Sequence, residues 1–287
     1  VLFRSRRVCG KCVTQMPTES QKNLDGEVVV LRATSNNGVM SNNTQHSPNN
    51  TITLPQCWKD VQDCMDAGID RIILFGPAGT GKTYAGLHFG DVTAGAHRLV
   101  CTEDMTSMDV TGAFMPDGNG KFSWVAGSAL KAWEGNGVVG GRLIVDEVDK
   151  ASGDVFALLL AMLDSPESAS WEHPETGRIH RPKQGFSAVM TTNIENMAEL
   201  PTALADRFPV RIRINEPHPT ALEKLSPDLR KYAVRMCDAG KKRISLRTFM
   251  AYDKLRKQLG DDNASRVIFG DRAQDVLDAI RIDGVSL

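Results

Sequence analysis

The sequence carries almost no net charge and contains no long apolar run, and each shortage excludes a class of protein. Its 34 Lys and Arg nearly balance its 35 Asp and Glu, so no overall basic field attracts nucleic acid. Its longest apolar run, Val155 to Leu163, is too short to span a bilayer. The 287 residues are enough for one large domain, or for a large domain with a small one.

Cysteine is sparse and scattered, which excludes a disulfide framework. The six cysteines lie at positions 9, 12, 57, 64, 101 and 237, and four of them fall in apolar or helical contexts. We therefore expect a reducing, cytoplasmic compartment. Cys9 and Cys12 have the spacing of half a zinc site, but no second pair of ligands is visible nearby. Two free thiols are the favoured interpretation, and a zinc site stays open as the alternative.

Residues 1–50 contain too few apolar residues to bury a core, so we expect a disordered leader. Its first residues, Val1 to Ser5, read like the translated end of a sequencing adapter, and no initiating Met precedes them. We treat them as an artefact and leave them out of the fold argument. On this interpretation the true N-terminus is missing from the sequence.

From residue 51 to residue 215, short apolar runs alternate with helical patterns. Helices are expected over 54–67, 82–89 and 153–163, and strands over 71–75, 98–101, 141–145, 186–191 and 209–214. Strands that alternate with helices predict an α/β domain, with a mostly parallel sheet between helices on both faces.

Beyond residue 216 no strand pattern appears. Apolar residues recur at helical spacing in two stripes, one from Phe249 to Leu259 and one from Ala273 to Ile280. We therefore expect residues 216–287 to form a small all-helical domain.

Two segments interrupt the α/β rhythm, and both have the turn chemistry of hairpins. In residues 104–130 the turn is Asp117-Gly118-Asn119-Gly120, and in residues 169–182 Pro174 and Gly177 lie at the turn. Each segment carries a tryptophan, Trp124 in the first and Trp171 in the second. Local packing and contact with a substrate are equally good explanations of these two side chains.

The segment Gly76–Thr83 carries the most specific chemistry in the chain. It fits Gly-x-x-x-x-Gly-Lys-Thr between an expected buried strand and an expected helix, which is the context of a phosphate-binding loop. Glycines let successive backbone N–H groups curl around phosphate oxygens, and the following helix directs its positive N-terminal end at the anion. The expected nucleotide-binding residues are Gly76, Pro77, Ala78, Gly79, Thr80, Gly81, Lys82, Thr83 and Tyr84.

Within this loop, Lys82 places a positive charge against the β- and γ-phosphates, and the Thr83 hydroxyl takes a coordination position on Mg²⁺. The expected cofactors are therefore ATP and Mg²⁺.

Hydrolysis also needs carboxylates, and Leu143-Ile144-Val145-Asp146-Glu147 supplies two at the end of a buried strand. Asp146 is expected to hold Mg²⁺ with Thr83, and Glu147 to orient and deprotonate the attacking water. Asn193 ends the next strand. It would lie beside the acidic pair if its strand runs between the first and third strands, where it could position the water or contact the γ-phosphate.

Together these motifs resemble the AAA+ ATPases, and within them the MoxR and CbbQ/NorQ-type proteins of the dynein-related group. The resemblance covers roughly residues 52–260. It rests on the following strings in order: Gly76–Thr83, Asp109-Val110-Thr111-Gly112, the segment 120–130, Val145-Asp146-Glu147-Val148-Asp149-Lys150-Ala151, Thr192-Asn193, and the segment 200–208 with Asp206-Arg207-Phe208.

The resemblance implies an AAA+ P-loop NTPase fold, with a five-stranded parallel sheet of order 5-1-4-3-2 and a helical lid. It implies that Arg207 is an arginine finger offered to the γ-phosphate in a neighbouring subunit. It also implies that Arg247 reaches the nucleotide from the lid, where Ser245 is a plausible helix N-cap. Glu147, Asn193, Arg207 and Arg247 are thus the expected catalytic residues.

The resemblance further implies a homo-oligomeric, hexameric ring that acts as a chaperone. It would remodel or activate a protein complex or assist metal or cofactor insertion, with a von Willebrand factor A-domain partner among the possibilities. The two hairpins would line or flank the central channel. Val148-Asp149-Lys150 replaces the Asn-Arg usual after the acidic pair in MoxR-type proteins, and no aromatic pore-loop signature is evident.

Three other functions stay open. One is a nucleic-acid motor or loader, which the near-neutral charge disfavours. The second is a relative of the McrB-like, restriction-type GTPases, although no Asn-Lys-x-Asp guanine-reading string is present. The third is a catalytically inactive scaffold that only binds nucleotide.

Overall fold

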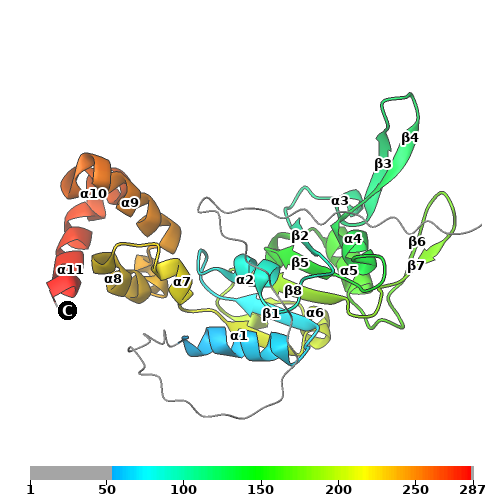
Figure 1. Ribbon diagram of the computed structural model, residues 1–287, viewed down its shortest axis with the longest axis horizontal. Helices are drawn as coiled ribbons and strands as arrows, with labels where there is room; N and C mark the ends of the chain where they lie inside the picture. The colour runs from blue at the N-terminus through cyan, green and yellow to red at the C-terminus, as the bar shows by residue number, and fades with distance from the viewer. Residues whose placement is uncertain (1–53, 286–287) are drawn as a thin grey trace, which may run out of the picture. The chain divides into compact units, whose positions relative to one another are not determined.

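The computed structural model describes residues 54–285. The expected leader, with Cys9 and Cys12, lies outside these residues. A sheet of five parallel strands forms the centre of the α/β part (Figure 1). Its strands are β1 (Arg71–Phe75), β2 (Ala96–Val100), β5 (Arg142–Asp146), β8 (Ser187–Thr191) and β9 (Val210–Arg213).

The strand order is β2-β5-β8-β1-β9. Counted along the chain and read from the other edge, this is 5-1-4-3-2, so the expected order is confirmed. Strand β8 lies between β1 and β5, and it therefore brings the residues that follow it next to those that follow β5. Asn193 was expected beside the acidic pair only if its strand ran between the first and third strands, and β8 does so.

Helices cover both faces of the sheet because alternate strand residues point to opposite sides. On one face, Ile73, Leu143 and Met190 belong to a core cluster with residues of α4, α5 and α6. On the other, Ile72, Leu74 and Val189 pack with α1 and α2. The helices of the α/β part are α1 (Gln56–Asp66), α2 (Lys82–His88), α3 (Ser107–Thr111), α4 (Ser128–Glu134), α5 (Gly153–Met162) and α6 (Thr202–Arg207).

The central strands are apolar on both sides, which is why the sequence signal for them was strong. Every residue of β5 is buried, and four of the five residues of β1 are. The one arginine of β1, Arg71, is buried, and its guanidinium lies 4.9 Å from the centre of the Phe186 ring and donates to the backbone carbonyl of Asp70. The charged residue at the start of β1 is thus accommodated without interrupting the core.

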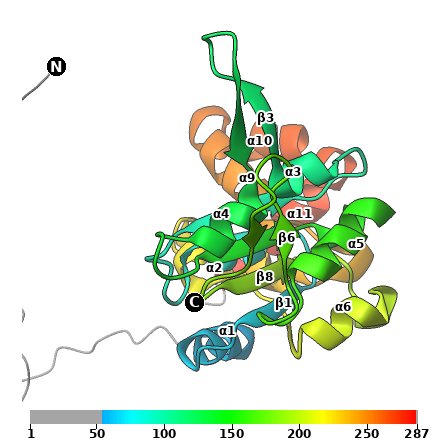
Figure 2. The same ribbon diagram turned by 90° about the vertical axis from the view of Figure 1, so that its right-hand side faces the viewer.

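Both expected hairpins are present (Figure 2), and aromatic rings of the two hairpins contact each other. The longer one pairs β3 (Gly112–Pro116) with β4 (Phe122–Ala126), and the shorter one pairs β6 (Trp171–Glu172) with β7 (Ile179–His180). The Trp124 and Trp171 rings lie 5.4 Å apart, and His173 lies 5.0 Å from Trp124. These two tryptophans therefore pack the hairpins together, whereas Phe122 near the longer tip is 68% exposed.

Residues 216–285 are helical, and their core is a separate cluster of buried residues (Figure 1). The helices are α7 (Pro219–Leu222), α8 (Pro227–Cys237), α9 (Leu246–Leu259), α10 (Asp261–Phe269) and α11 (Ala273–Val285). Ser245 caps α9 by accepting a hydrogen bond from the backbone N–H of Thr248, as the sequence led us to expect. Of the expected stripe, Phe249 and Tyr252 are buried, but Leu259 at its end is largely exposed.

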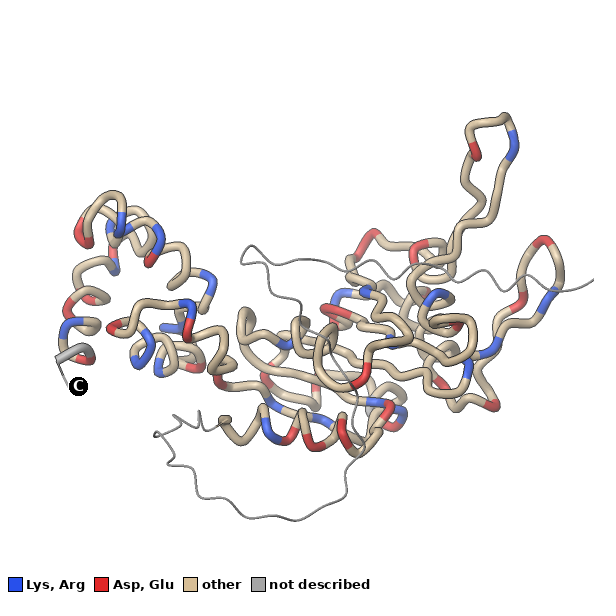
Figure 3. Tube along the Cα trace, viewed as in Figure 1, with Lys and Arg blue, Asp and Glu red and all other residues tan. Residues whose placement is uncertain are grey.

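Between residues 54 and 285, no helix is both long enough and apolar enough to cross a membrane. Acidic and basic residues are mixed along both the α/β part and the helical part (Figure 3).

Candidate functional site

The segment between β1 and α2 curls tightly, and its glycines make that path possible. Gly76, Gly79 and Gly81 all have positive φ, a region that other residues rarely adopt. A Cβ on Gly76 would lie 2.8 Å from the carbonyl oxygen of Ile214, which is too close for any other residue. The Thr80 hydroxyl closes the turn by donating to the carbonyl of Pro77 at 3.1 Å. The loop is thus preformed.

Lys82, the first residue of α2, folds back over this loop and is only 5% exposed. Its Nζ donates to the carbonyls of Gly76 and Pro77, each at 2.8 Å, and to Oδ1 of Asn193 at 3.1 Å. Burial and, second to it, the positive charge of Arg243 lower the pKa of Lys82 to about 8. The ammonium therefore lacks a full counter-charge at this position, so an anion in the loop would stabilise it.

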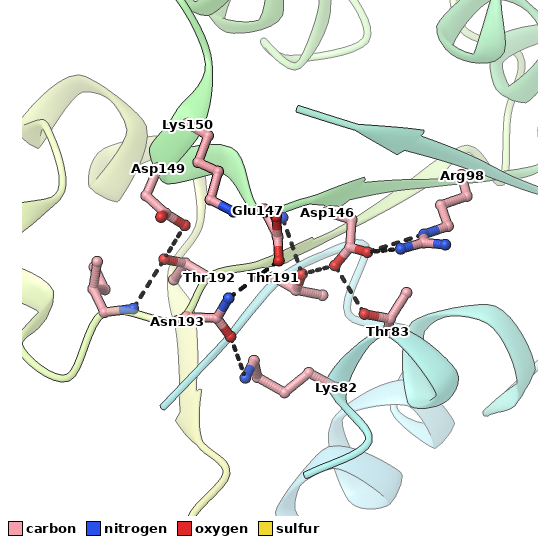
Figure 4. A network of polar contacts seen from close by, with 11 residues as sticks. Lys82, Thr83, Arg98, Asp146, Glu147, Asp149, Lys150, Thr191, Thr192 and Asn193 are labelled. Carbon is pink, nitrogen blue, oxygen red and sulfur yellow. Dashed lines mark hydrogen bonds and ion pairs between the residues drawn. The ribbon is translucent and has the colours of Figure 1, made fainter. Parts of the chain in front are cut away.

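Asp146, the last residue of β5, is buried and collects hydrogen bonds from three side chains (Figure 4). Its Oδ1 accepts from the hydroxyls of Thr83, at 2.8 Å, and Thr191. Its Oδ2 accepts from Nε of Arg98 at 2.9 Å and also from Nη2. Burial would raise the pKa of Asp146, but these bonds outweigh it and hold the pKa below 3.8.

Glu147 follows with a strained backbone. Within residues 54–285, it alone among the non-glycine residues has a positive φ, at 57°. Its carboxylate accepts from Nδ2 of Asn193 at 3.3 Å and from Nζ of Lys150 at 2.6 Å (Figure 4). The contacts from Lys82 to Asn193 and on to Glu147 thus link the loop to the acidic pair. Next to them, Thr192 donates to Asp149 at 2.6 Å and fixes the strand end.

A cavity of about 360 Å³ opens over these groups. Residues from three sources line it: the loop with the start of α2, the strand ends, and the helical segment. The loop contributes Lys82 and Thr83, the strands contribute Asp146, Glu147 and Asn193, and the helices contribute Lys224, Leu246, Arg247 and Met250. Tyr84 lies at its rim, 60% exposed and stacked on His88 at 4.2 Å.

Of the expected site residues, Arg207 lies away from this cavity, and Gly76 and Pro77 belong to the adjoining loop without lining it. Its Nη2 pairs with Oδ2 of Asp164 at 2.8 Å, and its Nη1 donates to the carbonyl of Ala203 at 2.9 Å. By contrast Arg247, on the first turn of α9, is exposed and lines the cavity. The chain thus brings together every expected residue except the one that the resemblance assigned to a neighbouring subunit.

The donor set at the strand ends suits Mg²⁺. No cluster of three or more His, Cys, Asp or Glu able to hold a metal occurs among residues 54–285. Thr83 Oγ1 and Asp146 Oδ1 are hard oxygen ligands 2.8 Å apart beside the loop. Mg²⁺ in phosphate sites commonly takes one or two protein ligands and completes its shell with phosphate oxygens and water. A fit therefore requires a nucleotide phosphate as well as these two residues.

Some residues of the site were not predicted from the sequence, among them Arg98, Thr191 and Trp58. Arg98 and Thr191 contact Asp146 from the two strands that flank β5. The buried Trp58 lies beneath the loop, 3.5 Å from a Cβ built on Gly81, and donates to the carbonyl of Glu216 at 2.9 Å. The expected strand order already placed the strands of Arg98 and Thr191 beside β5, but no local signal singles out these two side chains or Trp58.

One family model and several solved structures are similar to parts of the chain. Residues 71–208 match the model described as AAA domain (dynein-related subfamily). No curated protein matches the chain. Among solved structures, the chain is similar to NtrX from Brucella abortus, with 18% identity and a TM-score of 0.48; the match covers 71% of this chain and 51% of NtrX.

Two further structures extend the comparison. NtrX in complex with ATP matches with 14% identity and a TM-score of 0.43, over 80% of this chain and 66% of that one. A candidate ATPase from Cytophaga hutchinsonii ATCC 33406 matches with 17% identity and a TM-score of 0.42, over 74% and 60%. The chain thus spans about half to two thirds of the length of these structures.

The order of the sheet, the curled loop after its first strand and the family match agree with one another. Residues 71–208 match the model described as AAA domain (dynein-related subfamily), and the chain has the AAA+ P-loop NTPase fold.

Proposed function

We propose that this chain hydrolyses ATP in the cavity over the loop Gly76–Thr83. One observation carries the proposal: Lys82, Asn193 and Glu147 form a continuous chain of contacts that ends beside Asp146. A cation for phosphates, a carboxylate for a metal and a second carboxylate for water are thus within reach of one bound nucleotide. These are the parts that phosphoryl transfer to water needs.

The loop and α2 bind the phosphates. The backbone N–H groups of the loop and the Lys82 ammonium hold the phosphate oxygens, and Lys82 leaves its carbonyl partners to do so. Thr83 and Asp146 hold the Mg²⁺ that accompanies the nucleotide. When bound, this ion neutralises charge on the phosphate oxygens.

Glu147 orients the attacking water and accepts its proton. The positive φ of Glu147 turns its side chain out of the strand, and Asn193 and Lys150 tether its two carboxylate oxygens. A tethered carboxylate keeps the water in line with the γ-phosphate, which is where orientation contributes to the rate. Asn193 contacts both Lys82 and Glu147 and so aligns base and phosphate with each other.

The pocket is completed by a neighbouring copy. Arg207 does not line its own chain's cavity, and its guanidinium forms an ion pair with the partly exposed side chain of Asp164. In a ring, that guanidinium leaves Asp164 and reaches the neighbour's γ-phosphate, where an arginine stabilises the transition state. Arg247 acts from the helical segment on the nucleotide of its own chain. Residues 216–287 thus serve as a lid on residues 51–215, in a ring that we take to be a hexamer.

The biological role follows from the resemblance to the MoxR and CbbQ/NorQ-type proteins. The ring uses hydrolysis to remodel or activate a protein complex, or to aid insertion of a metal or cofactor. The exposed tip of the β3–β4 hairpin, with Met115 and Phe122, is available to a protein client. A partner with a von Willebrand factor A domain is one such client.

Replacing the base tests the proposal. Glu147→Gln should slow ATP turnover about 10²- to 10⁴-fold, the range for loss of a general base, while ATP still binds. Glu175→Gln, in the turn of the short hairpin, is the matched control and should turn over at the native rate. Equal rates for Glu147→Gln and the native chain would sink the assigned role. Competition by GTP and stimulation by DNA or RNA, measured in the same assay, test the GTPase and nucleic-acid alternatives.

A further inference from the structure

Of the side chains that donate to Asp146, that of Arg98 is the most exposed, and Arg98 has no role in the proposed reaction. It lies on β2, the edge strand next to β5, where Val100 pairs with Asp146. Arg98 and Val100 point to the same face, since side chains alternate along a strand. Its Nε and Nη2 both donate to Oδ2 of Asp146, forming a charge-assisted fork.

Asp146 has no acceptor site to spare. An ionised carboxylate offers about four lone-pair sites, and four donors occupy them: two N–H groups of Arg98 and the hydroxyls of Thr83 and Thr191. A metal ion, or a water bound to it, can therefore reach Asp146 only where a present donor leaves. The carboxylate that the proposed function gives to Mg²⁺ is already neutralised by a guanidinium.

Of the donors, Arg98 is the one free to leave. Thr191 is 2% exposed and is fixed within a central strand, and Thr83 is needed beside the metal. The Arg98 side chain is 48% exposed, and the carbonyl oxygen of Arg98 accepts from Ser128 at 3.0 Å, which holds the backbone while the side chain can turn. Arg98 also lines the same cavity as the loop, so its displaced guanidinium stays close to where phosphates bind.

We propose that Arg98 is a resident counter-cation on Asp146 that a nucleotide–Mg²⁺ complex displaces, after which its guanidinium contacts the phosphates. This inference rests on the proposed binding of nucleotide at Gly76–Thr83. Before the nucleotide binds, Arg98 balances the charge of Asp146 and holds its carboxylate in place. The metal and the phosphates are therefore expected to bind together. The metal alone would displace Arg98 and leave its guanidinium without an anion, and the phosphates alone would draw Arg98 away and leave Asp146 without a cation.

The test measures two affinities with a fluorescent ribose-labelled ADP, which is not hydrolysed. The first is the free Mg²⁺ concentration that half-saturates the labelled ADP complex, and the second is the affinity for the labelled ADP at saturating Mg²⁺. In Arg98→Ala the half-saturating Mg²⁺ concentration should fall about fivefold, the effect of removing a half-exposed ionic competitor. The affinity for the nucleotide should fall by a similar factor, because a phosphate contact is lost.

Two further variants make the result specific. Arg98→Lys keeps the charge but cannot fork onto Oδ2, so its half-saturating Mg²⁺ concentration should also fall. Arg281→Ala, at an exposed position of α11, should match the native chain in both measurements. The proposal is overturned if Arg98→Ala leaves the Mg²⁺ requirement unchanged or raises it. It is equally overturned if Arg98→Ala keeps the native affinity for the labelled ADP at saturating Mg²⁺, since the proposed phosphate contact would then be absent.

A measurement on the unmodified chain guards against variants that do not fold. The Nε–H resonance of Arg98 should be protected from solvent exchange in the free chain. It should lose that protection when ADP and Mg²⁺ are added together. Protection that persists in the complex would contradict displacement. A chain that binds no nucleotide would instead refute the proposed function. In that case, electron paramagnetic resonance of Mn²⁺ binding to the native chain and to Arg98→Ala, both without nucleotide, would test by itself whether Arg98 competes with the metal for Asp146.

Discussion

Two buried polar networks, one at the strand ends and one in the helical segment, differ in how completely their charges are matched. At the strand ends, the Lys82 ammonium is bound to backbone carbonyls and an amide rather than to a carboxylate. In the helical segment, Asp253 of α9 accepts from the backbone and hydroxyl of Ser226 at 3.0 and 2.7 Å, and from Nε of Arg256 at 3.0 Å.

Arg256 in turn forks onto Asp228 at 2.6 and 2.8 Å, so the helical network is closed. A closed network holds one arrangement, because any rearrangement leaves a buried charge without a partner. The network at the strand ends can rearrange when an anion and a metal supply the missing partners. We therefore expect changes at the strand ends to affect ligand binding, and changes in the helical network to affect stability.

The largest expected effect comes from Lys82→Met. Losing a charged hydrogen bond to phosphate should weaken ATP binding about 30-fold. The free energy of unfolding should stay level or rise, because a desolvated ammonium with a lowered pKa is removed. Calorimetric titration with ATP and urea unfolding measure the two quantities. Lys241→Met, at an exposed position, is the control. Unchanged ATP affinity in Lys82→Met would contradict the claim that the network at the strand ends serves ligand binding.

Asp253→Ala should show the opposite pattern. The side chain is 4% exposed, and its removal leaves Ser226 and the Nε of Arg256 without their acceptor. The free energy of unfolding should fall by about 2 kcal/mol, while the affinity for ATP changes less than about twofold. Asp262→Ala, whose side chain is 86% exposed, should leave both quantities unchanged. A large loss of ATP affinity with intact stability would mean that the two networks are not separate in function.

Acid should weaken the helical network in a defined window. Burial would raise the pKa of Asp253, but hydrogen bonds from Ser226 and the charge of Arg256 outweigh it and bring the pKa below 3.8. A depressed carboxyl pKa contributes stability above the unfolded value, and that stability is lost as the pH falls through the folded value. Unfolding free energy should therefore decline below about pH 4, and more gently in Asp253→Asn than in the native chain. Identical pH profiles for the two chains would contradict this cause.

The smallest effect is expected where neither network is involved. Trp171→Ala removes a ring that packs on Trp124 of the other hairpin and on His173 of its own. The free energy of unfolding should fall by about 1 kcal/mol, the typical worth of an aromatic pair, with ATP affinity unchanged. Ile179→Ala, on the exposed side of the same hairpin, should have less effect. A Trp171→Ala chain as stable as the native one would show that the tryptophans do not hold the hairpins together.

The sequence allowed most of the fold to be predicted because its signals are local. Near-continuous apolar runs mark β1 and β5, and the turn at Asp117 to Gly120 marks the long hairpin. Element ends were less well placed: β2 begins at Ala96 rather than Arg98. The short helices α3 and α4 that flank the long hairpin were not anticipated, since each has seven residues or fewer and carries little periodicity.

The side-chain pairs of the site could not be predicted in the same way. The loop and the acidic pair are contiguous strings, and the structure places them around one cavity. The contacts of Arg98 with Asp146 and of Arg207 with Asp164 join residues 48 and 43 positions apart. Such pairs depend on which strands and helices are neighbours and on where long side chains turn, and neither is encoded in a local pattern.

In the proposed function, this cavity hydrolyses ATP with Arg207 supplied by a neighbouring copy. A mixture of two inactive variants tests this arrangement. Glu147→Gln lacks the base but presents Arg207, and Arg207→Ala lacks the arginine but keeps an intact base. In random rings made from equal amounts, about a quarter of the pockets combine Glu147 of one copy with Arg207 of the next, so turnover should recover to about a quarter of the native rate. A mixture no more active than the two variants measured apart would contradict the shared pocket.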